Sequence, residues 1–549
     1  MVDLKQIWGS IMDEFSNRQR FLLASFDLTE EEEHIFGQFY RFLDDSGVAE
    51  IIKKSIRNET EKGGRPNVNF FNLFAAILYG FARGRSTLRE IEDACGHDIR
   101  FINMMQQVRP SYTTIAKFIN DVIVPNEDEI FGCINRQIIK EMNIELKDAF
   151  IDGTKWEANA NKYKFVWKPL RYHKKISMSF FNLLQANNLC ASFRKEELVK
   201  SSTITKAIDT LETEKDTYED KKYKDIKTAL GAMLFKVLNY EEKEKICGDG
   251  RKSYFKTDHD ATAMSLKTDY YSGNGSNFHA AYNVQALVIK GMVFAYRVSQ
   301  ERTDINDFVP TLEKFHSLYQ TYPQNVCADS GYGSLYNYAF LEKNNIGNYV
   351  KYQTWEGNVS GSYPESYRLI NSETIECLNK KIGKPVDIPG RHPKKAGSVF
   401  FRIDDCVGCP FKDYCMRYFK DPDIQINRIF EVNTELHRLK QLAEANLLSS
   451  KGIEIRVNRS IQVEGVFGIE KQDVRYVRAR RRGSQKVSTE IMLVFLGLNI
   501  KRLLSFYETG KVLEFWVAPN DLQSESFKKP SAKRLSKKGK KLHGNIYNK

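Results

Sequence analysis

The sequence predicts an α/β protein in which one mixed sheet is interrupted by two insertions and preceded by an all-α domain. Three observations support this class. Short helix-like segments with tight turns fill residues 66–145. Strand-like and helix-like segments then alternate from residue 147 onward, and two long stretches, about 170–250 and 353–455, interrupt the alternation. A chain of 549 residues is too long for one simple core, and we expect roughly three or four structural units.

Residues 1–145 form the expected N-terminal domain. Thr87 and Glu90 have the spacing of a capping box and open a helix that runs to Cys95, where Gly96 is expected to end it. The other helices expected here are Phe70–Phe81, Asp98–Gln106 and Ser111–Ile123. Such an array is typical of helix-turn-helix DNA-binding domains, although the pattern alone favours an ordinary helical bundle.

Residues 146–510 form the expected core, whose first and fourth strands each end in an aspartate. The elements expected in order are a strand at 147–152, a hairpin of Phe278–Ile289 and Met292–Val298, a helix at Asp307–Tyr319, a strand at Asn325–Ala328, a helix at Leu335–Asn344 and a strand at Asn348–Lys351. Asp152 and Asp329 follow the first and fourth strands. Ligands of mixed α/β sheets bind where strands end, so this edge is the expected site.

The interruptions differ in character. Residues 170–250 are rich in Lys and Glu and have a helical period, so we expect a helical insertion there. Residues 353–455 are expected to be loops around a cysteine cluster, and a long helix is expected to begin near Asn458. Residues 511–549 form a basic tail, and its part from Ser526 to Lys549 holds nine Lys or Arg and no acid, which favours a polyanionic partner.

Composition limits the function. The net charge of +13 and the pI near 9.0 favour nucleic acid as the partner. The longest apolar run, Ile491–Leu498, is far shorter than the roughly 20 residues of a membrane span, and the N-terminus lacks the apolar core of a secretory signal. Nine mostly isolated cysteines suit a reducing cytoplasm. The motifs of nucleotide-binding loops do not occur.

Three acidic residues lie in distinctive runs. Asp152 lies in IDGTKWEANANKYKFVW, Asp329 in VCADSGYGS and Glu464 in RSIQVEGVFGIEK. Three carboxylates from different elements suit a pair of Mg²⁺ ions, which prefer oxygen ligands. Two metals about 3.5–4 Å apart can activate the nucleophile and support the leaving oxygen when a phosphodiester is cut.

The segment around Glu464 predicts an amphipathic helix with a cationic face. At about 100° per residue, a glycine and four cations fall within roughly 40° of Glu464. These residues are Gly468, Lys471, Arg475, Arg478 and Arg482, and the apolar far side holds Val463, Val466, Ile469, Val474 and Val477. This face could lie along a phosphate track, although such a run is more often a solvated charged surface. Arg480 and Arg481 are further candidates for phosphate contacts, which position DNA without reading its sequence.

These three runs resemble the DDE transposases of bacterial insertion sequences, in the branch with an N-terminal helical DNA-binding domain and an interrupted ribonuclease-H-like core. The resemblance covers about residues 147–505, and residues 66–125 resemble the N-terminal domain of that branch. It implies that Asp152, Asp329 and Glu464 are the catalytic, metal-binding triad for two Mg²⁺ or Mn²⁺ ions. It also implies that Arg459 and Lys471 help to position DNA.

The resemblance implies an enzyme that cuts DNA at the terminal inverted repeats of its element and joins the freed 3′-OH to target DNA. We therefore expect double-stranded DNA as partner, a homo-oligomer on DNA, no membrane, and a cytoplasmic location on the chromosome. Two alternatives stay open, a nuclease of the same fold and a non-catalytic, transposase-derived DNA-binding protein such as a repressor.

A cysteine cluster offers a second metal site. Cys406, Cys409 and Cys415 give C-x₂-C-x₅-C, and the first pair has the spacing of metal ligands. A structural Zn²⁺ would need a fourth ligand, for which Cys377, His392 and His437 are the candidates. Three reduced thiols in a turn are the alternative.

Overall fold

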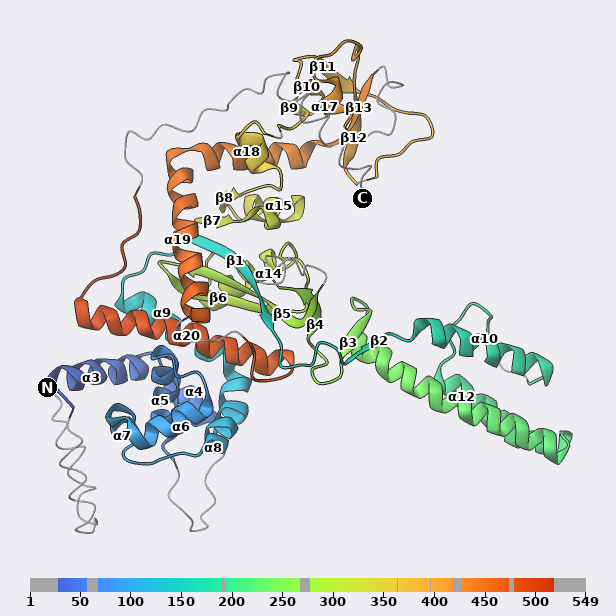
Figure 1. The fold of residues 1–549 in the computed structure, drawn as a ribbon, viewed down its shortest axis with the longest axis horizontal. Coiled ribbons are helices and arrows are strands. Elements are labelled where there is room, and N and C mark those ends of the chain that lie inside the picture. The colour runs from blue at the N-terminus through green and yellow to red at the C-terminus, as the bar shows by residue number, and fades with distance from the viewer. Residues whose placement is uncertain are drawn as a thin grey trace, which may run out of the picture.

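The computed structural model describes residues 28–56, 68–189, 193–266, 277–362, 364–394, 396–417, 427–472 and 478–517. Figure 1 shows a central sheet with the N-terminal helices on one side and a second, smaller sheet on the other. A helical arm projects sideways from the central sheet (Figure 1). The part of the basic tail from Ser526 onward lies outside the described residues.

The central sheet is mixed, as the sequence predicts. Its strands are β1 (Asp148–Glu157), β4 (Thr262–Ser265), β5 (Phe278–Ile289), β6 (Met292–Ser299), β7 (Asn325–Ala328) and β8 (Gly347–Val350). They pair in the order β4-β5-β1-β7-β8, and β6 also pairs with β5. Pairing is antiparallel among β4, β5, β6 and β1, and parallel from β1 to β7 and from β7 to β8. Lys290 and Gly291 turn the β5–β6 hairpin at φ of 51° and 72°, so the expected hairpin is confirmed.

Five helices pack against this sheet: α14 (Phe308–Tyr319), α15 (Leu335–Lys343), α18 (Thr434–Leu448), α19 (Ser450–Gln472) and α20 (Ser484–Thr509). α19 crosses β1 and β7, and α20 packs on β6 (Figure 1). The apolar run Ile491–Leu498 lies in α20, where it is buried between the sheet and the N-terminal helices. Among the described residues, no helix has the length and apolar character to cross a membrane.

The N-terminal helices share one hydrophobic core with the central sheet, because α20 packs against both. They are α3 (Glu30–Asp45), α4 (Val48–Ser55), α5 (Phe70–Ala82), α6 (Leu88–His97), α7 (Ile99–Met104), α8 (Tyr112–Phe118) and α9 (Glu127–Glu141). A Cβ on Gly497 of α20 would lie 2.6 Å from the Cβ of Phe81, so the two helices approach at a residue without a side chain. The N-terminal helices and the central sheet are therefore held together by side-chain packing and not only by the segment that connects them.

The capping box at Thr87 is confirmed, and the expected end of its helix is wrong. The Glu90 amide donates to Thr87 Oγ1 at 3.0 Å, and the Thr87 amide donates to the Glu90 carboxylate at 2.9 Å. Gly96 lies inside α6, which ends only at His97. The position of a Gly96 Cβ lies 3.1 Å from Arg109 Nε, so this glycine makes room for a packed arginine instead of stopping the helix.

The first insertion is helical, as expected, and has a small core of its own. Its elements are β2 (Phe165–Trp167), α10 (Leu170–Ala186), α11 (Ser201–Thr213), α12 (Asp220–Cys247) and β3 (Ser253–Phe255). β2 and β3 pair as an antiparallel ribbon at the base of the arm. Buried His173 ties the helices together: its ring nitrogens lie 2.9 Å from the Glu244 carboxylate and 2.8 Å from the Val199 carbonyl.

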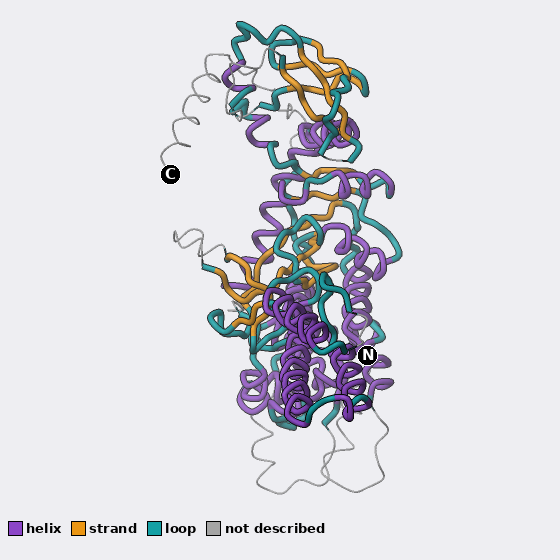
Figure 2. Tube along the Cα trace, turned by 90° about the vertical axis from the view of Figure 1, so that its right-hand side faces the viewer, coloured by secondary structure: helices purple, strands orange, loops and turns teal. Residues whose placement is uncertain are grey.

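The second insertion is a folded sheet, so the expectation of loops is wrong. Its elements are α16 (Trp355–Val359), β9 (Tyr367–Asn371), β10 (Thr374–Cys377), β11 (Ile382–Pro385), β12 (Ser398–Ile403), α17 (Lys412–Cys415), β13 (Arg428–Asn433) and α18 (Thr434–Leu448). The five strands pair antiparallel in the order β13-β12-β11-β10-β9. Figure 2 shows strands at two separate levels along the molecule. Four- to six-residue strands that bury one face carry too few apolar residues for a clear pattern.

Candidate active site

The site begins where β1 and β7 run side by side. Their parallel register pairs Ile151 with Ala328, so the next residues on the two strands are Asp152 and Asp329. β7 ends there, and Asp329 opens a short turn by accepting the Ser330 amide at 2.7 Å. The two carboxylates therefore leave neighbouring strands at the same edge of the pairing.

Asp152 does not end its strand, contrary to the expectation of a strand at 147–152. β1 continues to Glu157 because β5 still pairs with it, and Asp152 itself pairs with Ala286. What ends at Asp152 is only the pairing with β7. The change of neighbours exposes one side of β1 at this residue, and the Asp152 side chain is 25% exposed.

Arg459 of α19 connects the two aspartates. Its Nη2 atom lies 3.0 Å from Asp152 Oδ2 and 4.0 Å from Asp329 Oδ2. The Arg459 side chain is only 17% exposed, so this charge lies in a region of lowered dielectric constant where it interacts strongly with both carboxylates. A cation therefore already occupies the space that the two acids share.

Glu464 lies on α19, so the expected helix is confirmed, although it begins at Ser450 rather than near Asn458. Glu464 is exposed on the helix, whereas Val463 and Val466 are buried. Five residues separate it from Arg459, which corresponds to a rise of about 7.5 Å and a rotation of about 140°. Among the described residues, no three acidic, His or Cys side chains are close enough to hold a metal ion. The structure thus brings Asp152 and Asp329 together and leaves Glu464 separate from them.

A hydrogen-bond network behind Asp152 was not predicted from the sequence. Asp304 accepts from Lys155 Nζ at 2.8 Å and from the side-chain amides of Asn283 and Gln285 at 2.9 Å each. A Cβ on Gly153 would lie 2.3 Å from Gln285 Nε2 and 2.9 Å from Asp304 Oδ1. The position after Asp152 therefore requires glycine, because Gln285 and Asp304 occupy the space that a side chain would take.

Tyr332 links the second motif to the same network. Its hydroxyl donates to Gln285 Oε1 in a short hydrogen bond, and its ring is fully buried. Burial raises the pKa of Tyr332 far above its ordinary value, and the negative charges of Asp152 and Asp304 add to this effect. The tyrosine is thus a neutral donor that joins the ADSGYGS run to β5. Cys327, before Asp329, is buried as expected, and burial raises its thiol pKa to about 12.

The prediction of one continuous cationic face around Glu464 is partly wrong. α19 ends at Gln472, so Arg478 and Arg482 do not continue its helical face. Arg478 instead donates to the carbonyls of Ala158 and Ala160 at 3.1 and 3.0 Å, and Arg482 donates to that of Asn159 at 3.0 Å. These arginines brace the segment after β1. Arg475 and the side chain of Lys471 lie outside the described residues.

The neighbouring arginines join the core to the N-terminal helices. Arg480 donates to Ser86 at 3.0 Å, and Arg481 donates to Asn120 at 3.0 Å. Their backbone amides donate to the carboxylate of Glu490 on α20. These two side chains therefore make contacts within the protein, which the charge pattern alone does not reveal.

An exposed ribbon of aromatic residues was also missed. Tyr163, Phe165 and Trp167 are 77%, 43% and 64% exposed and lie among three lysines in the run KYKFVWK. Phe165 and Trp167 contact each other edge to face at the start of the helical arm. Aromatic rings interleaved with cations are typical of surfaces that bind nucleic acid, and this signal was readable in the sequence.

Asp152 and Asp329 thus lie on neighbouring parallel strands of a mixed sheet, and Arg459 of α19 lies beside both. Residues 377–504 match the family described as Transposase DDE domain, and residues 25–121 match the family described as Transposase domain (DUF772). The chain thus carries an N-terminal transposase domain followed by a DDE domain, the arrangement typical of insertion-sequence transposases. Comparison with curated proteins and with solved structures gives no match.

Proposed function

We propose that this chain is an active transposase that cuts DNA at the terminal inverted repeats of an insertion sequence and transfers the freed strand to target DNA. The observation that carries the proposal is the pair Asp152 and Asp329, which leave adjacent parallel strands and share the cation of Arg459. The matches to two transposase families supply the class of substrate.

The sheet topology supports a ribonuclease-H-like core. β6, β5 and β1 pair in turn antiparallel, β7 adds to β1 in parallel, and β8 adds to β7 in parallel. A parallel addition requires a crossover, and α14 and α15 supply the crossovers before β7 and β8. In this architecture the acids that follow the paired parts of β1 and β7 lie side by side.

The residues present fit a hard divalent cation. Asp152 and Asp329 offer carboxylate oxygens, the ligands that Mg²⁺ and Mn²⁺ prefer, and Arg459 shows that this space accepts positive charge. We infer that Asp152, Asp329 and Glu464 hold two such ions. When bound, these ions would supply charge stabilisation at the attacking and leaving oxygens of the phosphodiester.

Glu464 can join the two aspartates only if DNA or metal binding brings the side chains closer. Its carboxylate lies on an exposed face of α19, and among the described residues nothing beyond the backbone of this helix lies within 4 Å of the positions of a Cβ on Gly465 or Gly468. This open face admits a DNA backbone. Arg459 positions the two aspartates from the buried side of the same helix.

The DNA path that we propose follows the basic residues beside this face. Arg459, Lys471, Arg475, Arg478 and Arg482 are the candidate contacts, and the 49% exposure of Arg478 leaves part of its side chain open while it braces residues 158–160. The lysine and aromatic ribbon at Tyr163, Phe165 and Trp167 adds a surface on which bases could stack. We expect a homo-oligomer on DNA, so that two element ends can be held together.

Purified protein incubated with Mg²⁺ or Mn²⁺ and DNA that carries the ends of its element tests this proposal. We expect new 3′-OH ends followed by joined products. Cleavage without joining would instead identify a nuclease of the same fold, and binding without cleavage in either metal would identify a non-catalytic DNA-binding protein. Light scattering of the protein with and without DNA would measure the oligomer.

A further inference from the structure

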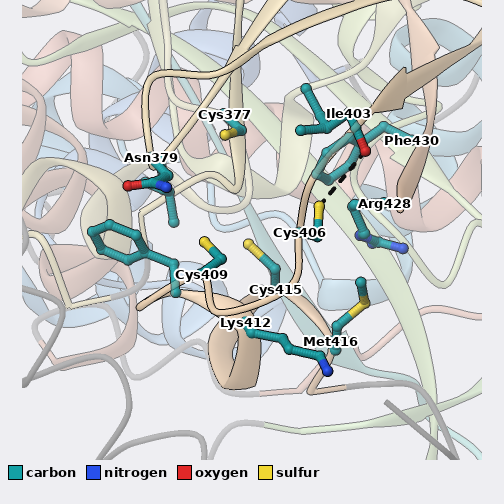
Figure 3. Close-up of a pocket in the computed structure, with 12 residues that line it drawn as sticks. Cys377, Asn379, Ile403, Cys406, Cys409, Lys412, Cys415, Met416, Arg428 and Phe430 are labelled. Atoms are coloured by element: carbon teal, nitrogen blue, oxygen red, sulfur yellow. Dashed lines mark hydrogen bonds between the residues drawn. The ribbon is translucent and has the colours of Figure 1, made fainter. Parts of the chain in front are cut away.

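Four cysteines surround one cavity in the second insertion. Cys377, Cys406, Cys409 and Cys415 all line a space of about 20 Å³ (Figure 3). This volume suits a single small ion or water molecule. Figure 3 shows the sulfur atoms of Cys409 and Cys415 turned toward the side of the cavity on which Cys377 lies. Four thiols around one small cavity form the donor set of a tetrahedral thiolate site.

The backbone of residues 406–415 holds three of these thiols on a tight double turn. The Cys409 amide donates to the Cys406 carbonyl at 3.4 Å, and Gly408 adopts a φ of 67° that permits the reversal. The next turn follows directly, because the Lys412 amide donates to the Cys409 carbonyl at 3.0 Å and α17 then ends at Cys415. The C-x₂-C-x₅-C spacing therefore folds into a compact thiol knuckle.

Three residues were candidates for the fourth zinc ligand, and among them Cys377 is the one that lines the cavity. Cys377 ends β10 at a hairpin turn, where the Lys380 amide donates to the Cys377 carbonyl at 2.8 Å, and this turn faces the knuckle. His437 is engaged elsewhere, since its Nε2 lies 2.6 Å from the Tyr367 hydroxyl. His392 is exposed and does not line the cavity. A thiol 29 residues upstream of Cys406 thus completes the set.

The surroundings suit an anionic metal–thiolate centre. Arg428 lines the same cavity as the four thiols, so its cation would help to offset the two negative charges that four thiolates and one Zn²⁺ would leave. The cysteines of this region form no disulfide. The thiols are not yet at ligand distance, because no three Cys, His, Asp or Glu side chains among the described residues can hold an ion as they stand.

We propose that Cys377, Cys406, Cys409 and Cys415 bind one structural Zn²⁺. Each thiol releases its proton to solvent and donates a sulfur lone pair to the metal, and small side-chain rotations bring the four sulfurs inward. The ion would tie the β10–β11 hairpin to the segment between β12 and β13 and so brace the five-stranded sheet. It would take no part in DNA cleavage.

The full-length protein, purified under reducing conditions without chelators, tests this site by its metal content. We expect one zinc per chain in the wild type, and less than a fifth of that in Cys377→Ser and in Cys409→Ser. His392→Ala, His437→Gln and Cys247→Ser serve as matched controls and should retain the metal. Replacement of zinc by Co²⁺ should give the intense sulfur-to-cobalt absorption of a tetrahedral thiolate site.

Variants that lose zinc because they misfold are recognised by their circular dichroism, and the cobalt spectrum of the wild type then decides the question. A folded wild type without zinc that also gives no thiolate spectrum with Co²⁺ would overturn the proposal. Retention of one zinc in Cys377→Ser and Cys409→Ser would overturn it as well. Loss of zinc in His437→Gln but not in Cys377→Ser would show that His437, rather than Cys377, is the fourth ligand, and would overturn the proposed set.

Discussion

Arg459 follows Asp152 by 307 residues in the chain, yet its Nη2 atom lies 3.0 Å from Asp152 Oδ2. The same atom lies 4.0 Å from Asp329 Oδ2. The guanidinium therefore offsets the repulsion between two carboxylates that the parallel register of β1 and β7 brings together. It also fixes α19, and with it Glu464, to the sheet that carries both aspartates.

Removing this guanidinium should destabilise the protein when no metal is present. For Arg459→Met, we expect the free energy of unfolding in EDTA to fall by about 1–3 kcal/mol, because a largely buried ion pair loses one partner. Mg²⁺ should restore part of the loss, since it binds only the folded pair of carboxylates. Urea unfolding with and without Mg²⁺ measures both effects.

Arg402→Met is the matched control for this variant. Arg402 pairs with Asp404 at 3.0 Å, but the two side chains are 49% and 60% exposed. We expect a loss of about 0–1 kcal/mol with no response to Mg²⁺. If the two variants lost equal amounts of unfolding free energy, the ion pair of Arg459 with Asp152 would be no stronger than an ordinary surface ion pair.

Gly153→Ala should disturb the site through packing. The added Cβ would meet Gln285 Nε2 at 2.3 Å, so the network of Asp304 and Gln285 has to move. We expect a loss of about 1–3 kcal/mol in stability and reduced DNA cleavage. Gly231→Ala in α12 is the control, because nothing lies within 4 Å of its Cβ and alanine favours a helix by up to about 1 kcal/mol. A Gly153→Ala protein as stable and active as wild type would contradict the packing argument.

The second insertion should weaken at mildly acidic pH. Burial lowers the pKa of His437 from 6.5 to about 4. The negative charge of Glu365 partly offsets this shift, and the positive charge of Lys440 adds to it. The imidazole is thus neutral in the folded chain, while the unfolded chain takes up a proton below about pH 6.5. Stability should be fully present above that pH and fall by on the order of 2–3 kcal/mol as pH drops to about 4.

Urea unfolding between pH 7 and 4 checks this sign. His437→Gln should flatten the pH dependence of that window, whereas His97→Gln, at an exposed position of α6, should leave it unchanged. A wild type whose stability rises as the pH falls from 6.5 to 4 would refute the assignment.

Local turn signals predicted the β5–β6 hairpin and β7, whereas β4 was not expected and β1 runs beyond the predicted end at residue 152. Asn325–Ala328 was expected with the bounds that the structure shows, and the Lys290-Gly291 turn fixed the hairpin. The proximity of Asp152 and Asp329 was readable because each acid follows an apolar stretch, and these two stretches pair as β1 and β7. Such information is local, so a single sequence contains it.

Relationships between distant segments could not be read from the sequence in the same way. The contact of Arg459 with Asp152 depends on how α19 crosses the sheet, and a helical wheel gives the faces of a helix but not its partner. Arg478 and Arg482 lie outside α19 and contact the carbonyls of residues 158–160, which the predicted helical face did not reveal. The role of α20 as a helix buried on both sides likewise depends on two other parts of the chain.

The central claim is that Asp152, Asp329 and Glu464 act as one metal-dependent unit. The most direct measurement compares Mg²⁺-dependent cleavage and joining of element-end DNA by Asp152→Asn, Asp329→Asn and Glu464→Gln, with DNA binding measured in parallel. Glu454→Gln on the same helix is the matched control. We predict that each of the three variants forms cleaved and joined products at least about 10³-fold more slowly than wild type while still binding DNA, and that the control stays active. Normal cleavage by any of the three would contradict the claim.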